Sequence, residues 1–434
     1  MILLESIYRK SPFLQKLWSG IYRLFHFCGT HLKFRKRYRP WIGSIPITSI
    51  LVGRQSGYSL EEWIERTGEY ERVSLSILNS PYLSLLREIK EDGARIKDEA
   101  FLRGHAYFKM ARTALLSTGH FMGAKNEMEI LEVMRNFIEF SKHFQLPHPE
   151  NKETVQHNFF FREQGHSSLN SPIKLNKIKF SNCFGVEDGH HRISILADRG
   201  YTEVKALIME EKTSYLQKLV LSGQQTHGDP ELYQPLPQPE LKDWPVVRKC
   251  RDRFKMMDDF LIQKKFKKNH LTLLDCSCSY GWFVNEFKKQ GLTVLGIDKD
   301  IIPVQIGRSA LGLKSNEIIQ HELVDFLENN HRSFDIVLFL SILHHFAIGK
   351  EDGEVARILK RLDQITSQII FIDTGQEHEK WNQERLAGWN DEYIIGTIRQ
   401  HTSFTKVIKL GEDNDNSGVY RDQYRRSLFA CSRN

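Results

Sequence analysis

Long apolar stretches and regularly spaced cysteines are both missing from this sequence. No apolar run among its 434 residues reaches the roughly 18 consecutive residues that a membrane-spanning helix needs. The six cysteines are scattered without the spacing of a metal site, and we interpret Cys276 and Cys278 as small packing residues. The start of the chain carries no recognisable secretory signal. We therefore expect a cytoplasmic chain that works in a reducing compartment.

Acidic residues are almost missing from the first 41 positions. That stretch holds nine lysine or arginine residues and a single acid, Glu5, which gives it a net charge of +8. The whole chain has a net charge of +7, so everything beyond residue 41 carries −1. The basic character therefore belongs to one segment, and it does not predict a nucleic-acid-binding surface across the protein.

The same segment has the pattern of an amphipathic helix. Ser11 and Pro12 are residue types typical of a helix start, and apolar residues then recur every three or four positions up to Phe25. Two aromatic residues are interleaved with five basic ones from Lys33 to Arg39. This combination favours docking of residues 1–41 on an anionic membrane surface. A helix packed on the protein itself or in an oligomer, and a contact with nucleic acid, remain open.

The length of the chain predicts two or three domains, because one compact core rarely serves so many residues. Five prolines between Gln224 and Pro245 indicate a semi-rigid linker. The predicted boundaries divide the chain into a basic amphipathic segment, a middle domain, the linker and a C-terminal domain, at residues 1–42, 43–222, 223–246 and 247–434.

One stretch of the C-terminal part, from Thr272 to Phe283, indicates a buried strand, a tight turn of small residues and the start of a helix. A second apolar strand follows and ends at Asp298. In an open α/β sheet, such a turn lets a nucleoside approach the backbone, and the acid of the second strand accepts hydrogen bonds from ribose hydroxyls.

The acid-x-small-x-small-x-Gly pattern of this turn resembles motif I of class I S-adenosylmethionine (SAM) methyltransferases. Serines stand at two positions where that family prefers glycine. The resemblance implies a Rossmann-like, seven-stranded α/β sheet, with further strands at 334–340, 368–373, 404–410 and 427–431, and strand-like character from Ile318 to Val324. It implies that SAM is held by Asp275, Ser277, Ser279, Gly281, Asp298, Asp325 and Phe326.

Two histidines, His344 and His345, follow the strand that ends at Leu340, where this family often carries a Ser-x-x-His-His segment. That edge of the sheet is where ligands bind. A histidine there could accept the proton of a hydroxyl acceptor, or the pair could only shape the pocket. An acceptor that is already an anionic phosphate needs no base.

In the middle of the chain, a short strand and turn over 44–51 precede a mostly helical stretch over about 60–150. Strand-like segments follow. The run Asp188-Gly189-His190-His191-Arg192 then joins a strand to a helix that should begin at His190 or His191. This run resembles the ParB and sulfiredoxin-like fold. The resemblance implies an α+β domain that binds ATP or CTP and contains a helical insertion. His190 stands where sulfiredoxin has its catalytic cysteine, which argues against sulfinic-acid reduction.

The physical basis for phosphate binding at this turn is simple. The first N–H groups of the helix and the Arg192 guanidinium would together form a cradle for an anion. Glu187 and Asp188 are available to hold Mg²⁺ or to contact an acceptor hydroxyl, as a kinase requires. A purely structural turn, nucleotide binding without chemistry, and phosphoryl transfer all remain open.

Together, these features favour a bifunctional enzyme that phosphorylates and methylates one acceptor at the inner face of a bacterial membrane. In its logic it resembles the kinase-methyltransferases that cap lipid-linked surface polysaccharides, so the implied acceptor is a glycan or another hydroxyl or phosphate group. One alternative is a single-activity O-methyltransferase with a nucleotide-sensing domain. Another is a DNA-associated ParB-like protein. The lack of a helix-turn-helix pattern after the middle domain argues against that alternative.

Overall fold

The computed structural model describes residues 39–54, 58–144, 172–223, 229–267, 269–348, 353–380, 382–417 and 424–433. The chain divides into two compact units, Met1–Trp41 and Ile42–Asn434. Residues 1–38 lie outside the described ranges, and with them almost all of the predicted amphipathic segment. Among the helices that the structure describes, none is both long enough and apolar enough to cross a membrane.

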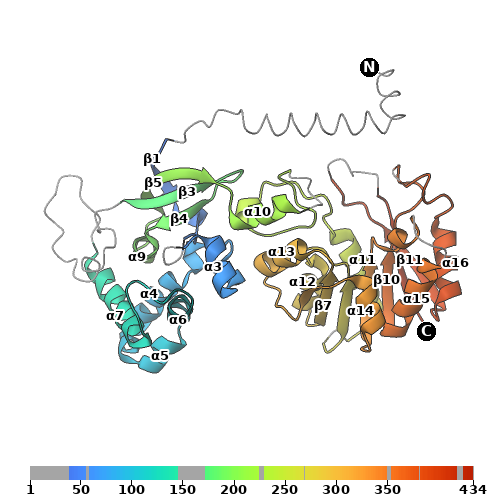
Figure 1. Cartoon of the computed structure of the whole chain (residues 1–434), viewed down its shortest axis with the longest axis horizontal. Coiled ribbons are helices and arrows are strands. Elements are labelled where there is room, and N and C mark those ends of the chain that lie inside the picture. The colour runs from blue at the N-terminus through green and yellow to red at the C-terminus, as the bar shows by residue number, and fades with distance from the viewer. Residues whose placement is uncertain are drawn as a thin grey trace, which may run out of the picture. The chain divides into compact units, whose positions relative to one another are not determined.

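The first part of the second unit is built on a five-stranded sheet with the order β1-β5-β3-β4-β2 (Figure 1). Its central strand β3 runs parallel to β5 and antiparallel to β4, and β4 runs parallel to β2. In chain order, the strands are β1 (Trp41–Pro46), β2 (Ile50–Leu51), β3 (Ile173–Ile178), β4 (Phe184–Asp188) and β5 (Glu203–Lys212).

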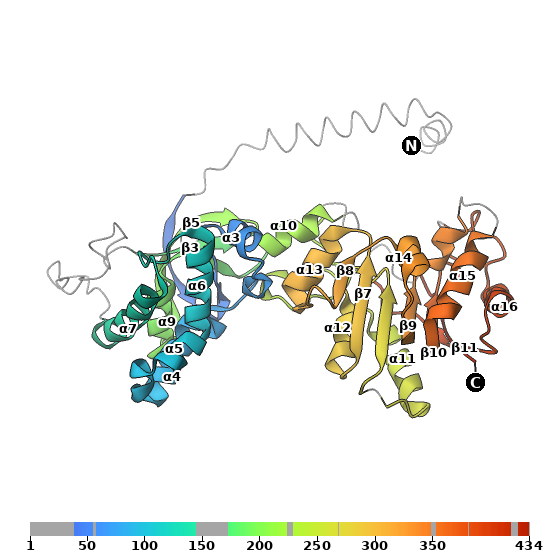
Figure 2. The same cartoon turned by 60° about the horizontal axis from the view of Figure 1, so that its bottom comes forward.

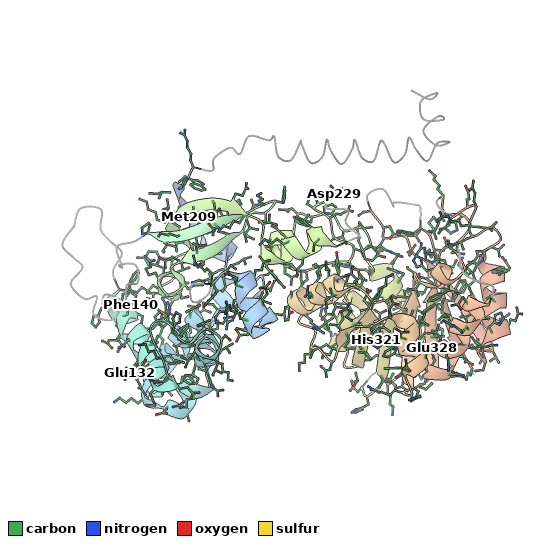
Figure 3. The ribbon with its side chains drawn as sticks, viewed as in Figure 1. Glu132, Phe140, Met209, Asp229, His321 and Glu328 are labelled. Atoms are coloured by element: carbon green, nitrogen blue, oxygen red, sulfur yellow. The ribbon has the colours of Figure 1, made fainter. Side chains whose placement is uncertain are left out.

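Helices occupy most of the chain between β2 and β3, where the sequence predicts a helical stretch. They begin at sequence signals: Ser59 forms a reciprocal capping box with Glu62, and Ser80 caps a helix whose first residue is Pro81. These helices are α3 (Leu60–Thr67), α4 (Pro81–Glu91), α5 (Glu99–Gly104), α6 (Ala106–Thr118) and α7 (Glu127–His143). Figure 3 labels Glu132 and Phe140 on α7 and Met209 on β5. Two more helices flank β5, α9 (His190–Asp198) and α10 (Tyr215–Ser222).

The C-terminal part contains a seven-stranded sheet with the order β11-β12-β10-β9-β6-β7-β8. The four pairings from β10 through β9, β6 and β7 to β8 are parallel, and β12 is antiparallel to both β10 and β11. The strands are β6 (Thr272–Cys276), β7 (Thr293–Asp298), β8 (Ile318–Gln320), β9 (Phe334–Leu340), β10 (Thr366–Asp373), β11 (Lys406–Glu412) and β12 (Ser427–Ser432).

Helices cover both faces of this sheet, as Figures 1 and 2 show. Alternate residues of β9 face opposite sides: Ile336 and Leu338 pack with one hydrophobic cluster, whereas Val337 and Phe339 pack with the other. The first cluster contains side chains of α11 (Arg251–Gln263), α12 (Trp282–Lys289) and α13 (Ile301–Leu311). The second contains side chains of α14 (Leu323–Asn329), α15 (Glu354–Ile365) and α16 (Asp391–His401).

Some predicted strand bounds differ from the structure by two residues, as for β11 with its predicted range of 404–410, and the bound of β8 differs more. The sequence pattern suggested strand from Ile318 to Val324, but β8 ends at Gln320 and α14 begins at Leu323. The reason is the partner strand. β8 pairs with β7, and their last paired residues are Gln320 and Asp298, the final residue of β7. Beyond that point the chain has no neighbouring strand to bond, and it turns into a helix.

The proline-containing segment makes contacts that a simple spacer would not need. The described part of the segment begins at Asp229, labelled in Figure 3, and four of its own apolar side chains are buried. These belong to a hydrophobic cluster that also holds residues of α10 and α13. The four side chains are Leu232, Leu236, Leu241 and Trp244. Burial of this size stabilises a defined path for the segment. The domain boundaries at residues 222 and 246 stay predictions.

Candidate functional site

The turn between β6 and α12 has a backbone that few residues adopt. Ser277, Ser279 and Gly281 have φ angles of 61°, 53° and 76°, all in the left-handed region. A Cβ atom on Gly281 would lie 2.8 Å from Leu313 Cδ1, so glycine is needed at that position for space as well as for conformation. The turn is anchored where the Cys278 N–H donates to the Ile297 carbonyl at 2.9 Å.

Asp298 ties this turn to the end of β7. Its Oδ2 atom accepts a hydrogen bond from the Ser279 N–H at 2.8 Å, and its Oδ1 atom accepts one from the Asp300 N–H at 3.0 Å. Burial raises the pKa of this carboxyl group, and the two N–H donors oppose that shift. Because each oxygen retains a further acceptor position, the carboxylate can still receive hydroxyl donors.

Asp275, the last but one residue of β6, has a buried carboxyl group. It is 2% exposed, and its Oδ2 atom has no hydrogen-bond partner among the described residues. Burial raises the pKa of Asp275 well above its usual range, and the nearby Asp298 charge adds to the shift. A ligand that brings a positive charge or a hydrogen-bond donor would relieve this cost.

A cavity of about 30 Å³ lies against the turn. Residues from outside the motif form much of its wall, among them Tyr233 and Gln234 of the proline-containing segment. Gln234 bonds the turn twice, because its Nε2 donates to the Cys278 carbonyl and its Oε1 accepts from the Trp282 N–H, both at 3.3 Å. The other lining residues are Arg248, Cys250, Arg253, Asp275, Ser277, Cys278, Ser279, Phe283, Leu340 and Ser341.

Two buried arginines bring positive charge to this cavity. Arg253 pairs with Asp373 Oδ2 at 2.9 Å, while Arg248 pairs with Asp413 and donates to the Ser341 hydroxyl at 2.7 Å. Although burial opposes it, these arginines lower the pKa of Asp373 to about 2. The Nε atoms of both arginines remain without hydrogen-bond partners within the described ranges.

These groups are complementary to the amino-acid end of SAM. The unpartnered oxygen of Asp275 suits an ammonium group, and the arginine Nε donors suit a carboxylate. Asp298 suits ribose hydroxyls. Arg248 and Arg253 were not among the predicted site residues. The signal in the sequence was the density of arginines around Cys250, at positions 248, 251 and 253.

The two histidines after β9 differ in their surroundings. His344 is 5% exposed, and its Nδ1 accepts a hydrogen bond from the Gly375 N–H at 3.0 Å. Burial, with the Arg426 charge, lowers the pKa of His344 to about 2, so the ring is neutral with its proton on Nε2. His345 has more of its surface in contact with solvent than His344, but burial of part of its ring, with the Arg426 charge, also lowers its pKa. A catalytic role for either histidine stays a prediction.

Asp325 and Phe326 lie in the first turn of α14, which begins shortly after β8, and not directly at the end of a strand as the sequence suggested. The Phe326 ring contacts His321, labelled in Figure 3, with the ring centroids 5.7 Å apart. His321 is itself the residue whose N–H donates to the Asp298 carbonyl at 2.8 Å. The structure therefore brings this pair near the carboxyl end of β7. Their predicted contact with adenine stays a prediction.

The side chains of the turn between β4 and α9 contact one another and neighbouring helices. Gly189 has a φ angle of 114° and precedes the helix, which begins at His190 as predicted. The Arg192 guanidinium pairs with Asp188 Oδ2 at 3.0 Å. His191 Nε2 lies 2.7 Å from the Tyr107 hydroxyl, and Tyr82 stacks on His190 at 5.2 Å between ring centroids. The histidine rings therefore pack against the helices between β2 and β3.

Glu187 has different partners from Asp188. One of its oxygens accepts from Arg54 at 2.8 Å and the other from Asn176 at 2.7 Å. Although burial opposes it, these two donors lower the pKa of Glu187. In the part of the chain that the structure describes, no three His, Cys, Asp or Glu residues are grouped so as to hold a metal ion. The Mg²⁺ site at Glu187 and Asp188 stays a prediction.

Comparison with known proteins places the C-terminal part. Residues 274–393 match the family described as "Methyltransferase domain". A curated relative, the O-antigen chain terminator bifunctional methyltransferase/kinase WbdD of Escherichia coli, is 26% identical over 148 residues, or 33% of this chain and 21% of that protein. The uncharacterized protein MJ0638 of Methanocaldococcus jannaschii is 28% identical over 128 residues, or 29% of this chain and 53% of that protein.

Similar solved structures have low TM-scores. A crystal structure of WbdD has a TM-score of 0.40 at 22% identity and covers 50% of this chain and 47% of its own. The SAM-bound magnesium protoporphyrin IX methyltransferase ChlM of Synechocystis PCC 6803 has a TM-score of 0.31 at 15% identity and covers 42% and 79%. This chain thus spans about a fifth of the length of the curated WbdD relative. The predicted class I fold is confirmed over the matched range: residues 274–393 are a methyltransferase domain.

Proposed function

We propose that this chain transfers a methyl group from SAM to an oxygen atom of a hydroxyl or phosphate acceptor. The observation that carries the proposal is the set of unpartnered buried groups around the Ser277–Gly281 turn. Asp275 offers an acceptor there, and Arg248 and Arg253 offer donors. Buried polar groups without partners are costly, so their gathering beside a nucleoside-binding turn supports a site shaped for a charged ligand.

Bound SAM supplies an electrophilic methyl group and a good leaving group. The residues of this chain then have two tasks, to hold the donor and to position the acceptor. Asp298 and Asp275 serve the first task. For the second, His345 is the candidate base for a hydroxyl acceptor because its ring reaches solvent, whereas the Nδ1 of His344 already accepts a backbone hydrogen bond.

The second part of the proposal gives the middle region a kinase activity. Its Asp188–Arg192 turn, with the N–H groups at the start of α9, would hold the phosphates of ATP or CTP, and Glu187 and Asp188 would hold Mg²⁺. The ParB-like resemblance of this turn supports the idea. So does the name of the E. coli relative, which combines methyltransferase and kinase in one protein.

The proposed acceptor is the end of a lipid-linked bacterial surface polysaccharide. Residues 1–41 would hold the enzyme on the anionic inner face of the membrane, through nine basic residues beside an apolar helical face. The name of the relative, a chain terminator of O-antigen, supports a glycan acceptor. Vesicles that contain anionic lipid should retain the full chain in sedimentation, and a chain without residues 1–41 should stay in the supernatant.

The test of the enzymatic proposal separates its two halves. Isothermal titration with SAM and with its demethylated product measures donor binding, and no heat from either with folded protein would contradict the methyltransferase half. Incubation with labelled ATP and short glycans measures phosphoryl transfer. Label that stays in nucleotide and free phosphate across a broad acceptor panel would contradict the kinase half alone.

A second candidate is a single-activity methyltransferase whose middle region senses a nucleotide. The packing of the His190 and His191 rings against Tyr82 and Phe137 favours it, because these rings are held as structural groups. Arg192→Ala distinguishes the two proposals. If the middle region is a kinase, the substitution should abolish phosphoryl transfer and leave SAM binding intact. If it is a sensor, the substitution should change how nucleotide affects methylation, and neither the native chain nor the variant should transfer phosphate.

A further inference from the structure

A second cavity, away from the Ser277–Gly281 turn, lies between the five-stranded sheet, α3 and α10. It measures about 370 Å³, enough for a small organic ligand. Its walls come from the ends of β2, β3, β4 and β5, from α3 and α10, and from the proline-containing segment through Glu240. We call it the sheet-end pocket. Glu187 lines it, but the residues from Asp188 to Arg192 do not.

Two side chains in the wall of this pocket are almost fully buried and carry acceptor atoms without partners. Glu240 is 1% exposed, and its Oε2 atom has no hydrogen-bond partner in the described chain, although Ser74 donates to its other oxygen. Asn176 is 8% exposed, and its Oδ1 atom also lacks a partner. Both atoms accept hydrogen bonds, so a ligand that satisfies them must donate.

The cations of the pocket are already paired. Arg54 lies 2.8 Å from Glu187 Oε1, Lys212 lies 2.6 Å from Glu210, and Lys218 pairs with Glu61. The charged lining residues comprise three cations and four carboxylates, namely Arg54, Lys212, Lys218, Glu61, Glu62, Glu187 and Glu240. This balance disfavours a phosphate or other anionic group, because the pocket has a slight negative excess and each cation has a carboxylate partner.

Apolar side chains form another part of the wall. It includes Leu51, Val52, Ile178 and Val186, together with the ring of Tyr215. A ligand that fits must therefore offer hydrogen-bond donors on one side and C–H surface on the other, without a negative charge. Sugars have this character, since their hydroxyls donate and their ring faces are C–H surfaces. Tyr215 adds an aromatic face with a polar tip.

We propose that the sheet-end pocket binds a neutral sugar, with hydroxyl groups donating to Glu240 and Asn176. The proposal deepens the function proposed above, on which it rests, because it assigns the acceptor end of the glycan to a particular cavity. Glu187 lines this cavity and is followed in the chain by Asp188, so the bound sugar would lie beside the turn proposed to hold the nucleotide.

Equilibrium binding to the full chain tests the proposal without any catalysis. The probes are glucose, galactose, mannose and rhamnose, followed by saturation-transfer NMR and titration calorimetry, with inorganic phosphate as the anionic comparison. At least one sugar should bind saturably and phosphate should not compete. Glu240→Gln should weaken sugar binding by about tenfold or more, because the substitution replaces a charged acceptor with a neutral amide.

A matched control and a second variant guard against a loss of folding. Glu65→Gln changes an exposed carboxylate of α3 outside the pocket, and it should leave sugar affinity unchanged. Leu60→Trp, at the half-buried first residue of α3, should fill the pocket from its rim and abolish binding without touching a buried polar group. Thermal unfolding shows whether each variant remains folded.

The outcomes distinguish this proposal from the function on which it rests. Absence of saturable sugar binding, sugar binding that both Glu240→Gln and Leu60→Trp leave intact, or competition by inorganic phosphate would each overturn it. SAM binding and methyl transfer would remain testable in the same preparation. Conversely, a chain that binds sugar in this pocket but transfers neither phosphate nor methyl would contradict the proposed function and leave the pocket assignment standing.

Discussion

The Ser277–Gly281 turn and the Asp188–His190 turn both join the end of a strand to the first residues of a helix. In the first turn, every second residue from Ser277 to Gly281 has a left-handed backbone angle, and Asp298 of the neighbouring strand accepts a hydrogen bond from the turn. In the second turn, one residue, Gly189, has such an angle, and Arg192 pairs with Asp188 of the same segment. A distant carboxylate therefore bonds the backbone of the first turn, whereas distant aromatic side chains contact the two histidines that follow Gly189 in the second.

The two turns also differ in the partners of the polar groups around them. Around the first, buried atoms of Asp275, Ser279 and two arginines remain without partners in the described chain. Around the second, the histidine rings pack against aromatic side chains of the helices between β2 and β3. Unsatisfied buried groups cost folding free energy, so a protein keeps them where a ligand will use them. This contrast makes the first turn the stronger candidate for binding.

The largest expected effect comes from removing an arginine of the donor site. Arg248→Leu leaves Asp413 buried without its ion-pair partner and should lower the free energy of unfolding by about 3–5 kcal/mol. Arg192→Leu, at the second turn, should cost less because the Asp188 side chain is 36% exposed and solvent screens the pair. Urea denaturation of both variants measures the difference.

The double variant Arg248→Leu/Asp413→Leu sharpens this comparison. Replacement of both partners removes the uncompensated charge, so most of the lost stability should return. SAM binding should not return, because the guanidinium that lines the cavity is still missing. Equal destabilisation by Arg248→Leu and Arg192→Leu would show that the two sites are not built differently.

Alanine at the two glycines should give the next largest effects. Gly281→Ala combines a left-handed backbone with a Cβ that would approach Leu313 to 2.8 Å, which together should cost about 2–4 kcal/mol. Gly189→Ala meets its nearest neighbour, Ile173, at 3.2 Å and should cost about 1–2 kcal/mol, mostly from backbone strain. Thermal unfolding ranks the two, and the reverse order would contradict the packing argument.

The sequence predicted the methyltransferase fold because its signals are local. Apolar strands of five to seven residues, such as the one over 334–340, lie between two helical layers and are apolar on both faces. Motif I was recognisable because a strand, small residues and a helix start are adjacent in sequence. The end of β8 could not be predicted, since it depends on where its partner β7 stops.

The walls of the sites were harder to predict for the same reason. Gln234 lies 44 residues from Cys278, to which it donates, and Arg253 lies 120 residues from Asp373. No periodicity connects such residues. The sequence showed prolines around Gln234 and therefore predicted a linker, but the apolar residues between those prolines bury their side chains. Those buried positions were visible only once the chain was folded.

Asp275→Asn tests the donor site through charge. The substitution keeps the shape of the side chain but removes its charge, so it should weaken SAM binding by about 10- to 100-fold, as expected for a hydrogen bond to a charged group. Titration calorimetry measures this loss. The variant should be at least as stable as the native chain near neutral pH, because burial of the native carboxylate is unfavourable. A loss of both affinity and stability would point to a structural role instead.

The pH dependence of stability gives this test a second measurement. Burial raises the folded pKa of Asp275 above its unfolded value of about 3.9, so the folded chain binds more protons between these two pKa values. The contribution of Asp275 to the free energy of unfolding therefore falls as pH rises through that range, by at most about 1.4 kcal/mol per unit. The stability of Asp275→Asn relative to the native chain should increase as the pH rises above about 4 in urea denaturation.

The smallest expected effect concerns the hydrogen bonds between the proline-containing segment and the first turn. Gln234→Leu removes both of its 3.3 Å hydrogen bonds, which at that length should contribute about 0.5–1.5 kcal/mol in total. SAM affinity should change by about 2- to 10-fold, and the Trp282 amide should exchange faster with solvent. Gln238→Leu is the matched control, because Gln238 donates from the same segment to the Ala310 carbonyl on α13, outside the donor cavity. If both variants alter SAM affinity equally, the segment acts as one packed unit on α13. If only Gln234→Leu does so, the turn is controlled through that single amide.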